Sequence, residues 1–157
     1  DFQASNPSDP LPASHVDAEL NRVKTVIDQI LANLVLARSF QAQEQYSEAI
    51  TYYRNVSSLS KAAYGAEALF AIAQCYYIQD RMEDAEKAAF ETVNKAGSYE
   101  EWVIRAYILL GDVYTRQKDY FNAKATYQSV YENTDIEELK LIAKNKLDQV
   151  EEAEKKK

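Results

Sequence analysis

Apolar residues recur at intervals of three and four along most of the chain, the spacing that places them on one face of an α-helix. The first run extends from His15 to Gln43 without a glycine or proline, and its apolar positions are Val16, Leu20, Val23, Ile27, Ile30, Leu34 and Ala37. We predict one helix of about 28 residues here, with Ser14 as N-cap and Asp17 completing a weak capping box. Its first half is expected to project or to cover the end of a helical array. A parallel coiled-coil dimer is the less favoured alternative, because a sustained coiled coil needs more heptads.

A second pattern, in residues 107–130, predicts a pair of helices and the contact between them. Its members are Leu110, Gly111, Tyr114, Tyr120, Ala123 and Tyr127. Gly111 allows a second helix to lie close across the first, and Tyr114 is a large wedge between the two. Ala123 is the small counterpart on the second helix, where Tyr127 seals the contact with a neighbouring unit. This spacing resembles the tetratricopeptide repeat, a helix–turn–helix unit that stacks into solenoids.

The same pattern occurs twice upstream. Its first copy consists of Leu36, Ala37, Phe40, Tyr46, Ala49 and Tyr53, and its second of Leu69, Ile72, Ala73, Tyr76, Met82 and Ala85. In the second copy Ala89 stands where an aromatic residue is expected, and we expect Phe90 beside it to supply the lost bulk. The six helices of the three repeats should lie near 29–43, 46–59, 64–79, 82–95, 99–117 and 120–132.

The last apolar stripe predicts a capping helix at about 135–154. Its members are Leu139, Ile142, Leu147 and Val150. Thr134 and Glu137 are expected to form a capping box at its start, and Ser98 and Glu101 another after a helix stop at Gly97. A helical array needs a terminal helix whose outer face is polar, and this segment suits that role.

The N-terminal residues 1–14 hold all three prolines, so we predict a disordered linker there. Residues 15–157 then form a single all-α domain, with repeats at about 30–59, 64–95 and 99–132. The start at Asp1 is compatible with the removal of a leader or a preceding domain.

Longer segments of the chain resemble one particular group of tetratricopeptide proteins. Residues 30–150 resemble tetratricopeptide proteins of the bacterial envelope, such as Tol-associated and outer-membrane assembly factors. The segments AYGAEALFAIAQCYY and EEWVIRAYILLGDVYTRQKDYFNAKATYQSV are similar to the C-terminal end of large repeat proteins from Bacteroidetes. The resemblance implies a right-handed solenoid of about three repeats and a location in the periplasm or at the outer membrane, with the cytoplasm left open. Lys61 and Gly97 replace the consensus proline between repeats, which leaves the angle between repeats open.

Charge, apolar content and cysteine count argue against nucleic-acid binding, a membrane span and an intramolecular disulfide. The net charge of −7 argues against nucleic acid, because phosphates are held by clustered Lys and Arg. No apolar run approaches the length of a membrane span. The single cysteine, Cys75, excludes an intramolecular disulfide.

No catalytic constellation or cofactor motif is present in the sequence. His15, the only histidine, has no assembled partner for general-base or metal chemistry. Cys75 lies on an apolar helix, which favours a small core residue over a reactive thiol. Paired carboxylates such as Glu100 and Glu101 are typical of a solvated helix face. We therefore predict a protein that is not an enzyme and binds neither a cofactor nor a metal.

The remaining candidate for function is a concave groove lined by the first helix of each repeat. Helical spacing predicts the following groove residues: Leu34, Arg38, Gln41, Phe70, Gln74, Tyr77, Ile108, Asp112 and Thr115. An aromatic and aliphatic floor with a few polar groups suits an extended peptide or an amphipathic helix of a protein partner. The alternative is that Phe70, Tyr77 and Ile108 are covered by neighbouring helices. Leu34, Phe70 and Ile108 occupy positions where a carboxylate clamp for chaperone tails would require Lys or Arg, so we do not expect that ligand.

Three functions remain open. The first is a monomeric, envelope-associated scaffold that binds a protein partner in the groove. The second is a structural end-module of a larger repeat protein whose binding surface lies upstream. The third is a ligand-binding accessory protein, although the sequence contains no large insertion that could form such a site.

Overall fold

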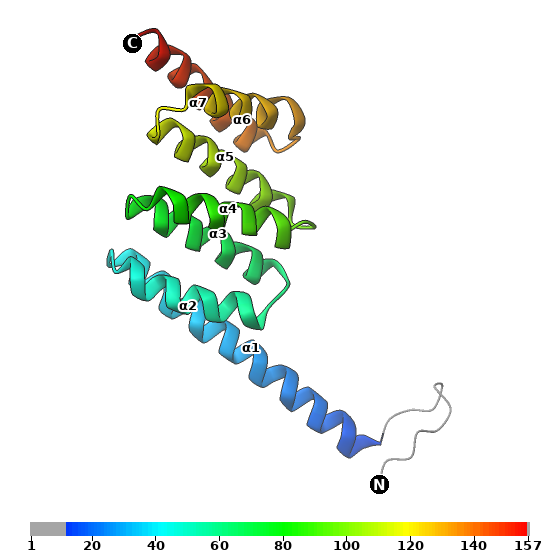
Figure 1. Ribbon diagram of the computed structural model, residues 1–157. Helices are drawn as coiled ribbons and strands as arrows, with labels where there is room; N and C mark the ends of the chain where they lie inside the picture. The colour runs from blue at the N-terminus through cyan, green and yellow to red at the C-terminus, as the bar shows by residue number, and fades with distance from the viewer. Residues whose placement is uncertain (1–11, 157) are drawn as a thin grey trace.

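The computed structural model describes residues 12–156, which fold into α-helices joined by short turns. The helices are α1 (Ala13–Ala42), α2 (Tyr46–Leu59), α3 (Ala63–Ile78), α4 (Met82–Lys95), α5 (Glu100–Arg116), α6 (Tyr120–Asn133) and α7 (Glu137–Lys155). Each packs against the next, so that they stack in chain order (Figure 1). The prediction of an all-α array is confirmed. The predicted linker falls largely on residues 1–11, which lie outside the described residues, and Ala13 and Ser14 already belong to α1.

The three turns that join the paired helices, α1 to α2, α3 to α4 and α5 to α6, share one geometry. Each contains a residue in the left-handed region, namely Glu44 (φ 60°), Asp80 (φ 61°) and Lys118 (φ 61°). Around Glu44, the Gln45 N–H donates to the Phe40 carbonyl at 2.9 Å, which satisfies a carbonyl at the end of α1. This is the Schellman arrangement, which ends a helix and turns the chain back.

Two predicted helix starts are corrected by the structure. Pro12, and not Ser14, precedes α1, and its carbonyl accepts hydrogen bonds from His15 and Val16. The residue before α5 is Tyr99, with no side-chain cap, so Ser98 does not form the predicted capping box. Gly97 does not adopt the left-handed conformation that a glycine helix stop would require. In both places the backbone itself supplies the turn, because Pro12 and Tyr99 carbonyls accept the first bonds of the next helix.

The predicted capping box before α7 is also corrected. Thr134 has an extended backbone, and its N–H donates to the Val130 carbonyl, which ends α6. Its hydroxyl then accepts the Ile136 N–H at 3.2 Å and shapes the connection, while α7 begins at Glu137. Thr134 is therefore the C-cap of α6 and does not cap α7.

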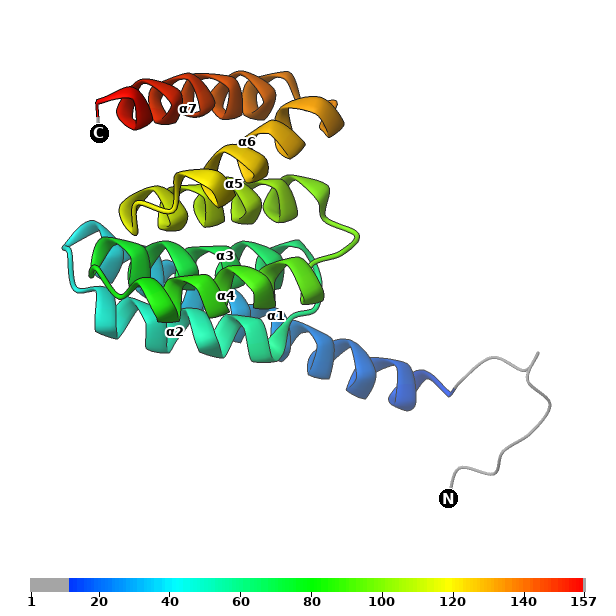
Figure 2. The same cartoon turned by 45° about the horizontal axis from the view of Figure 1, so that its top comes forward.

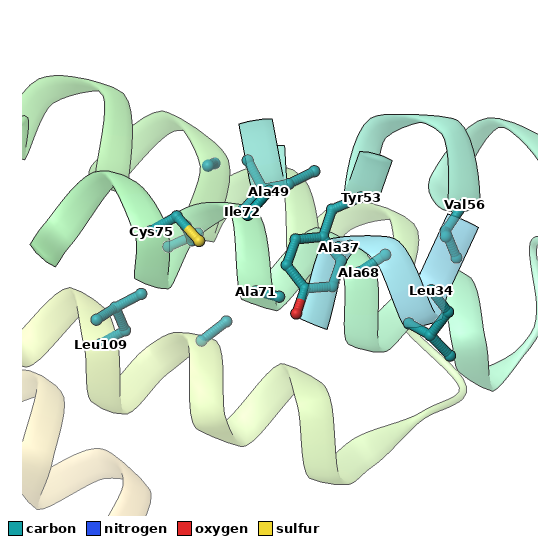
Figure 3. Close-up of a cluster of buried hydrophobic side chains, with 14 of the residues drawn as sticks. Leu34, Ala37, Ala49, Tyr53, Val56, Ala68, Ala71, Ile72, Cys75 and Leu109 are labelled. Atoms are coloured by element: carbon teal, nitrogen blue, oxygen red, sulfur yellow. The ribbon is translucent and has the colours of Figure 1, made fainter. Parts of the chain in front are cut away.

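The core follows the alternation of large and small residues. Ala37, Ala49, Ala73, Ala85, Ala123 and Ala143 are completely buried where helices approach one another. Figure 3 shows the Tyr53 ring beside Ala37, within a cluster that also holds Leu34, Ile72 and Cys75. A second cluster joins α5, α6 and α7 around Ile108, Tyr127 and Leu139.

The second repeat lacks an aromatic residue that the other two possess. Ala89 is completely buried, but Phe90 is 42% exposed. Phe90 therefore does not supply the bulk lost at Ala89, contrary to expectation, because adjacent helical positions point about 100° apart. Tyr114, the expected wedge, is only half-buried.

The two ends of the array differ in character. The first half of α1 projects beyond the other helices (Figures 1 and 2). Its apolar residues Val16, Leu20, Val23 and Ile27 are exposed. At the other end, α7 buries Leu139, Ala143, Leu147 and Val150 and turns a mainly polar face outward. No helix between residues 12 and 156 combines the length and the apolar content needed to cross a bilayer.

Candidate binding cleft

The odd-numbered helices lie next to one another along one side of the array. Besides its contacts with neighbours in sequence, α3 contacts both α1 and α5, and α5 also contacts α7. The first helix of each repeat therefore contributes to one shared surface, as the repeat pattern predicts. The hollows on this surface lie between α3, α5 and α7.

Two adjoining cavities form what we call the α3–α5–α7 cleft. The smaller, about 100 Å³, is lined by Phe70, Gln74, Arg105, Ile108, Leu109, Asp112, Leu139 and Ile142. The larger, about 420 Å³, is lined by Tyr77, Asp112, Thr115, Arg116, Lys118, Tyr120, Tyr127, Lys146, Gln149 and Val150. Asp112 borders both, so it marks the place where the two cavities meet.

Asp112 is held by two donors from different helices. The Tyr127 hydroxyl of α6 donates to Oδ1 at 2.5 Å, and Nζ of Lys146 in α7 donates to the same oxygen at 2.8 Å. Burial, together with the negative charge of Asp112, raises the pKa of the Tyr127 hydroxyl well above its ordinary value. The phenol thus stays protonated and keeps donating, which fixes the carboxylate between α5, α6 and α7.

The larger cavity has a basic rim. Arg116, Lys118 and Lys146 line it together with one carboxylate, that of Asp112. Arg116 bonds to Asp80 at 2.9 Å and lies over the Tyr77 ring, 5.1 Å from its centroid. Arg116 and Lys146 are each paired with a carboxylate, those of Asp80 and Asp112, so Lys118 gives this rim one excess positive charge in a chain whose net charge is −7.

Five of the nine predicted groove residues line the cleft with half-buried side chains: Phe70, Gln74, Tyr77, Asp112 and Thr115. The Phe70 ring also contacts Trp102, with 5.8 Å between ring centroids. Ile108 borders the smaller cavity but is only 6% exposed, because it packs into the cluster under α7. Its side chain therefore offers a ligand very little surface.

The three groove residues predicted on α1 line neither cavity of the cleft. Leu34 is 2% exposed and belongs to the core. Arg38 forms an ion pair with Glu67 of α3. Gln41 accepts a hydrogen bond from the Tyr53 hydroxyl at 2.5 Å and donates to Gln74 at 3.3 Å. In this structure these residues join the first repeat to the second.

The cleft also includes residues of α7 that the groove pattern does not predict, because the apolar stripe of that segment predicts only a cap. Lys146, Gln149 and Val150 form one wall of the larger cavity. The pair Ile142–Ala143 repeats the large–small pairs Leu36–Ala37, Ile72–Ala73 and Leu110–Gly111. That signal identifies α7 as a fourth first-helix, which faces the same side as α1, α3 and α5.

The described residues offer little reactive chemistry. They contain no group of three or more His, Cys, Asp or Glu placed to hold a metal ion. Burial raises the pKa of the Cys75 thiol to about 11, so it stays protonated at neutral pH. A further hollow of about 420 Å³ lies between α5 and α6, lined by Ile104, Tyr107, Ala125, Thr126, Ser129, Val130 and Asn133. It includes no predicted groove residue.

Comparison with known families supports the repeat assignment. Residues 34–101 match one model described as a tetratricopeptide repeat, and residues 104–133 match a second model with the same description. Together the two matches cover most of the segment that the apolar pattern divides into three repeats. No curated protein matches the chain.

Proposed function

Because the chain belongs to the tetratricopeptide repeat family, we propose that it is a non-enzymatic scaffold that binds a protein partner in the α3–α5–α7 cleft. Repeats of this family generally mediate protein–protein interaction. The observation that carries the proposal is the convergence of Phe70, Gln74, Tyr77, Asp112 and Thr115 on two adjoining cavities. One chain supplies every lining residue, so the monomer expected from the sequence is sufficient for binding.

The chemistry of the cleft favours an extended segment that carries at least one acidic residue. Phe70 and Ile142 provide apolar wall in the smaller cavity, and Gln74 provides an amide. The basic rim of the larger cavity would attract a carboxylate, because complementary charge guides a partner to its site. A peptide lying along both cavities would place an apolar side chain near Phe70 and an acidic one near Lys118.

The test is retention of partner proteins and of displayed random peptides by the immobilised chain. Lys118→Glu reverses a charge on the rim at an exposed position, and we expect retention of acidic peptides to fall about tenfold or more with an unchanged helical spectrum. Phe70→Glu should also reduce retention, because a charge in an apolar wall opposes ligand burial. Ile108→Glu is unsuitable, since that side chain is buried and its substitution should unfold α5 and α7.

Lys87→Glu is the matched control, because it makes the same charge reversal at an exposed position of α4, outside the cleft. Retention by this variant should equal that of the parent. If Lys118→Glu and Phe70→Glu retain ligand as well as Lys87→Glu while remaining helical, the cleft is not the binding surface.

A second candidate, the end-module of a larger repeat protein, is favoured by one specific observation. Val35 and Leu36 of α1 are 65% and 43% exposed. Their counterparts in α3, Ala71 and Ile72, are 6% and 0% exposed. In α3 the equivalent positions are covered by the preceding repeat, so the exposed residues of α1 suit contact with a further repeat upstream. The sequence context of the whole gene separates this candidate from the scaffold.

We also propose a location in the bacterial envelope, as the resemblance of residues 30–150 implies. This proposal rests on that resemblance alone. Fractionation of cells that express the protein, followed by detection in periplasmic, outer-membrane and cytoplasmic fractions, tests it, and recovery in the cytoplasm would contradict it. No observation on the cleft specifically favours the ligand-binding accessory function.

A further inference from the structure

The exposed side of α1 carries a row of apolar residues that no other helix within residues 12–156 covers. Leu20, Ile27 and Leu31 are 62%, 48% and 40% exposed, and Val16 and Val35 extend the row at either end. At 100° per residue these five positions lie within about 100° of one another on the helix. Exposed apolar rows of this length are typical of interaction surfaces.

The row differs from the heptad stripe that the sequence suggests. Ile30 and Leu34 of that stripe are buried, because α2 and α3 pack on them. A parallel coiled coil along the heptads could therefore use only the residues before Ile30. The residues that stay exposed follow mainly i, i+4 spacing, and such rows interlock when two helices cross at about 50°.

The row is also self-complementary. Val16 and Leu20 at one end are matched in reverse order by Leu31 and Val35 at the other, with Ile27 near the middle. A two-fold axis close to residue 26 would place Leu20 of one chain against Leu31 of a second. Such an axis generates the isologous contact that closes most homodimers.

The charges beside the row agree with this symmetry. Lys24 and Asp28 are exposed and one helical turn apart, so they lie on the same flank of α1. The same two-fold axis brings Lys24 of each chain beside Asp28 of the other and forms two ion pairs. In a parallel pair, Lys24 of one chain would lie at the same level along the helix axis as Lys24 of the other, so these ion pairs would not form.

We propose that two copies of this chain associate through α1, antiparallel and crossing near Ile27, with Leu20 packed on Leu31 of the second copy. The contact leaves the α3–α5–α7 cleft open, so each dimer would present two clefts. The first half of α1 projects from the array and does not cover its end, so it is available to a second chain (Figure 2). This association would replace the monomer expected from the sequence.

Sedimentation equilibrium of the full chain from low micromolar to millimolar concentration tests the association. We expect the mass to rise from one chain toward two. Leu31→Glu should shift the half-association concentration at least tenfold higher, whereas Leu141→Glu, the same change at an exposed position of α7, should not shift it. A mass of one chain throughout would overturn the proposal and leave the row to a preceding repeat or another protein. A dimer that Leu31→Glu leaves intact would overturn it as well.

Two further variants determine the orientation. Lys24→Asp should weaken association, and the double change Lys24→Asp with Asp28→Lys should restore it, since the two ion pairs reform with reversed sign. Under oxidation, Ile27→Cys should form intermolecular disulfides and Leu20→Cys should not, unless it is mixed with Leu31→Cys. Native Cys75 is buried and should not interfere. Efficient cross-linking of Leu20→Cys to itself would indicate a parallel pair and overturn the antiparallel arrangement.

Discussion

Two buried tyrosines occupy the same place in two repeats but have different partners. The hydroxyl of Tyr53 donates to the amide of Gln41, whereas that of Tyr127 donates to the carboxylate of Asp112. A hydroxyl buried in a helix interface needs an acceptor, and each repeat supplies one from its first helix. In the third repeat that acceptor is also charged, which is why Lys146 is drawn to the same point. In the repeat pattern Asp112 corresponds to Arg38, and Gln41 corresponds to Thr115, so differences at two positions separate the structural contact of the first repeat from the polar cleft of the third.

At the residue scale, stability should fall at alkaline pH through Cys75. Burial raises its pKa from 9.0 to about 11, so the folded state holds the proton more tightly than the unfolded state. The contribution is complete below about pH 9 and is lost as pH rises through 11, at a cost of roughly 1–3 kcal/mol. Tyr53, with a pKa raised by burial to about 12, adds a further loss above pH 10.

Urea unfolding at pH 7, 9 and 10.5 measures this dependence. Cys75→Ala removes the thiol titration, so its free energy of unfolding should fall less between pH 9 and 10.5 than that of the parent. The comparison uses the slope with pH, which the small cavity left by the substitution does not affect. Identical slopes for the two proteins would contradict the assignment to Cys75.

At the scale of elements, two of the three glycines lie so close to neighbouring atoms that a side chain would collide with them, and the third does not. A Cβ on Gly65 would lie 2.0 Å from the carbonyl oxygen of Ser60, in the turn that leads into α3. A Cβ on Gly111 would lie 2.3 Å from the Tyr127 ring. A Cβ on Gly97 would meet no atom within 4 Å beyond its chain neighbours. The packing of α5 against α6 therefore depends on Gly111, as its spacing in the sequence predicts.

Alanine at the three glycines should rank in the order of these contacts. Gly65→Ala should cost about 3 kcal/mol or more, because a backbone carbonyl must move. Gly111→Ala should cost about 1–2 kcal/mol, because the ring of Tyr127 can shift. The first repeat already has an alanine at the equivalent position, since Tyr53 packs beside Ala37 there. Gly97→Ala should be neutral or stabilising by up to about 1 kcal/mol. Chemical denaturation followed by circular dichroism measures all three, and equal stability of Gly65→Ala and Gly97→Ala would refute the argument.

At the scale of the whole molecule, stability should vary along the stack. In a helical array each repeat is held by its neighbours, so a segment that lacks them opens first. Among residues 13–29 of α1 only Val26 packs against the core cluster within the described residues, whereas residues 30–42 pack against α2 and α3.

Hydrogen exchange at low protein concentration, where chains are separate, should show weaker protection of residues 15–28 than of residues 30–42. We expect at least a hundredfold difference in protection, since opening the second part also disrupts packing. Raising the concentration should increase protection of the first part if α1 self-associates. Equal protection in dilute solution would show that the projecting half is covered within one chain.

The order and type of the helices were determined by local sequence. Periodic apolar residues and few glycines or prolines leave the backbone no better choice than helix, and the repeated large–small pairs specify which helices touch. This is why five cleft residues could be predicted from spacing alone. Helix caps were predicted less well, because Ser98 and Thr134 each had a competing backbone arrangement that only the folded turn reveals.

Tertiary structure decided which of two similar positions is buried and which is open. Leu34 and Phe70 are equivalent in the repeat pattern, yet Leu34 is in the core and Phe70 lines the cleft. Likewise Ile27 and Ile30 share one stripe, but only Ile30 is covered by neighbouring helices. Burial depends on what packs against a residue from distant parts of the chain, and apolar spacing within one helix carries no information about that neighbour.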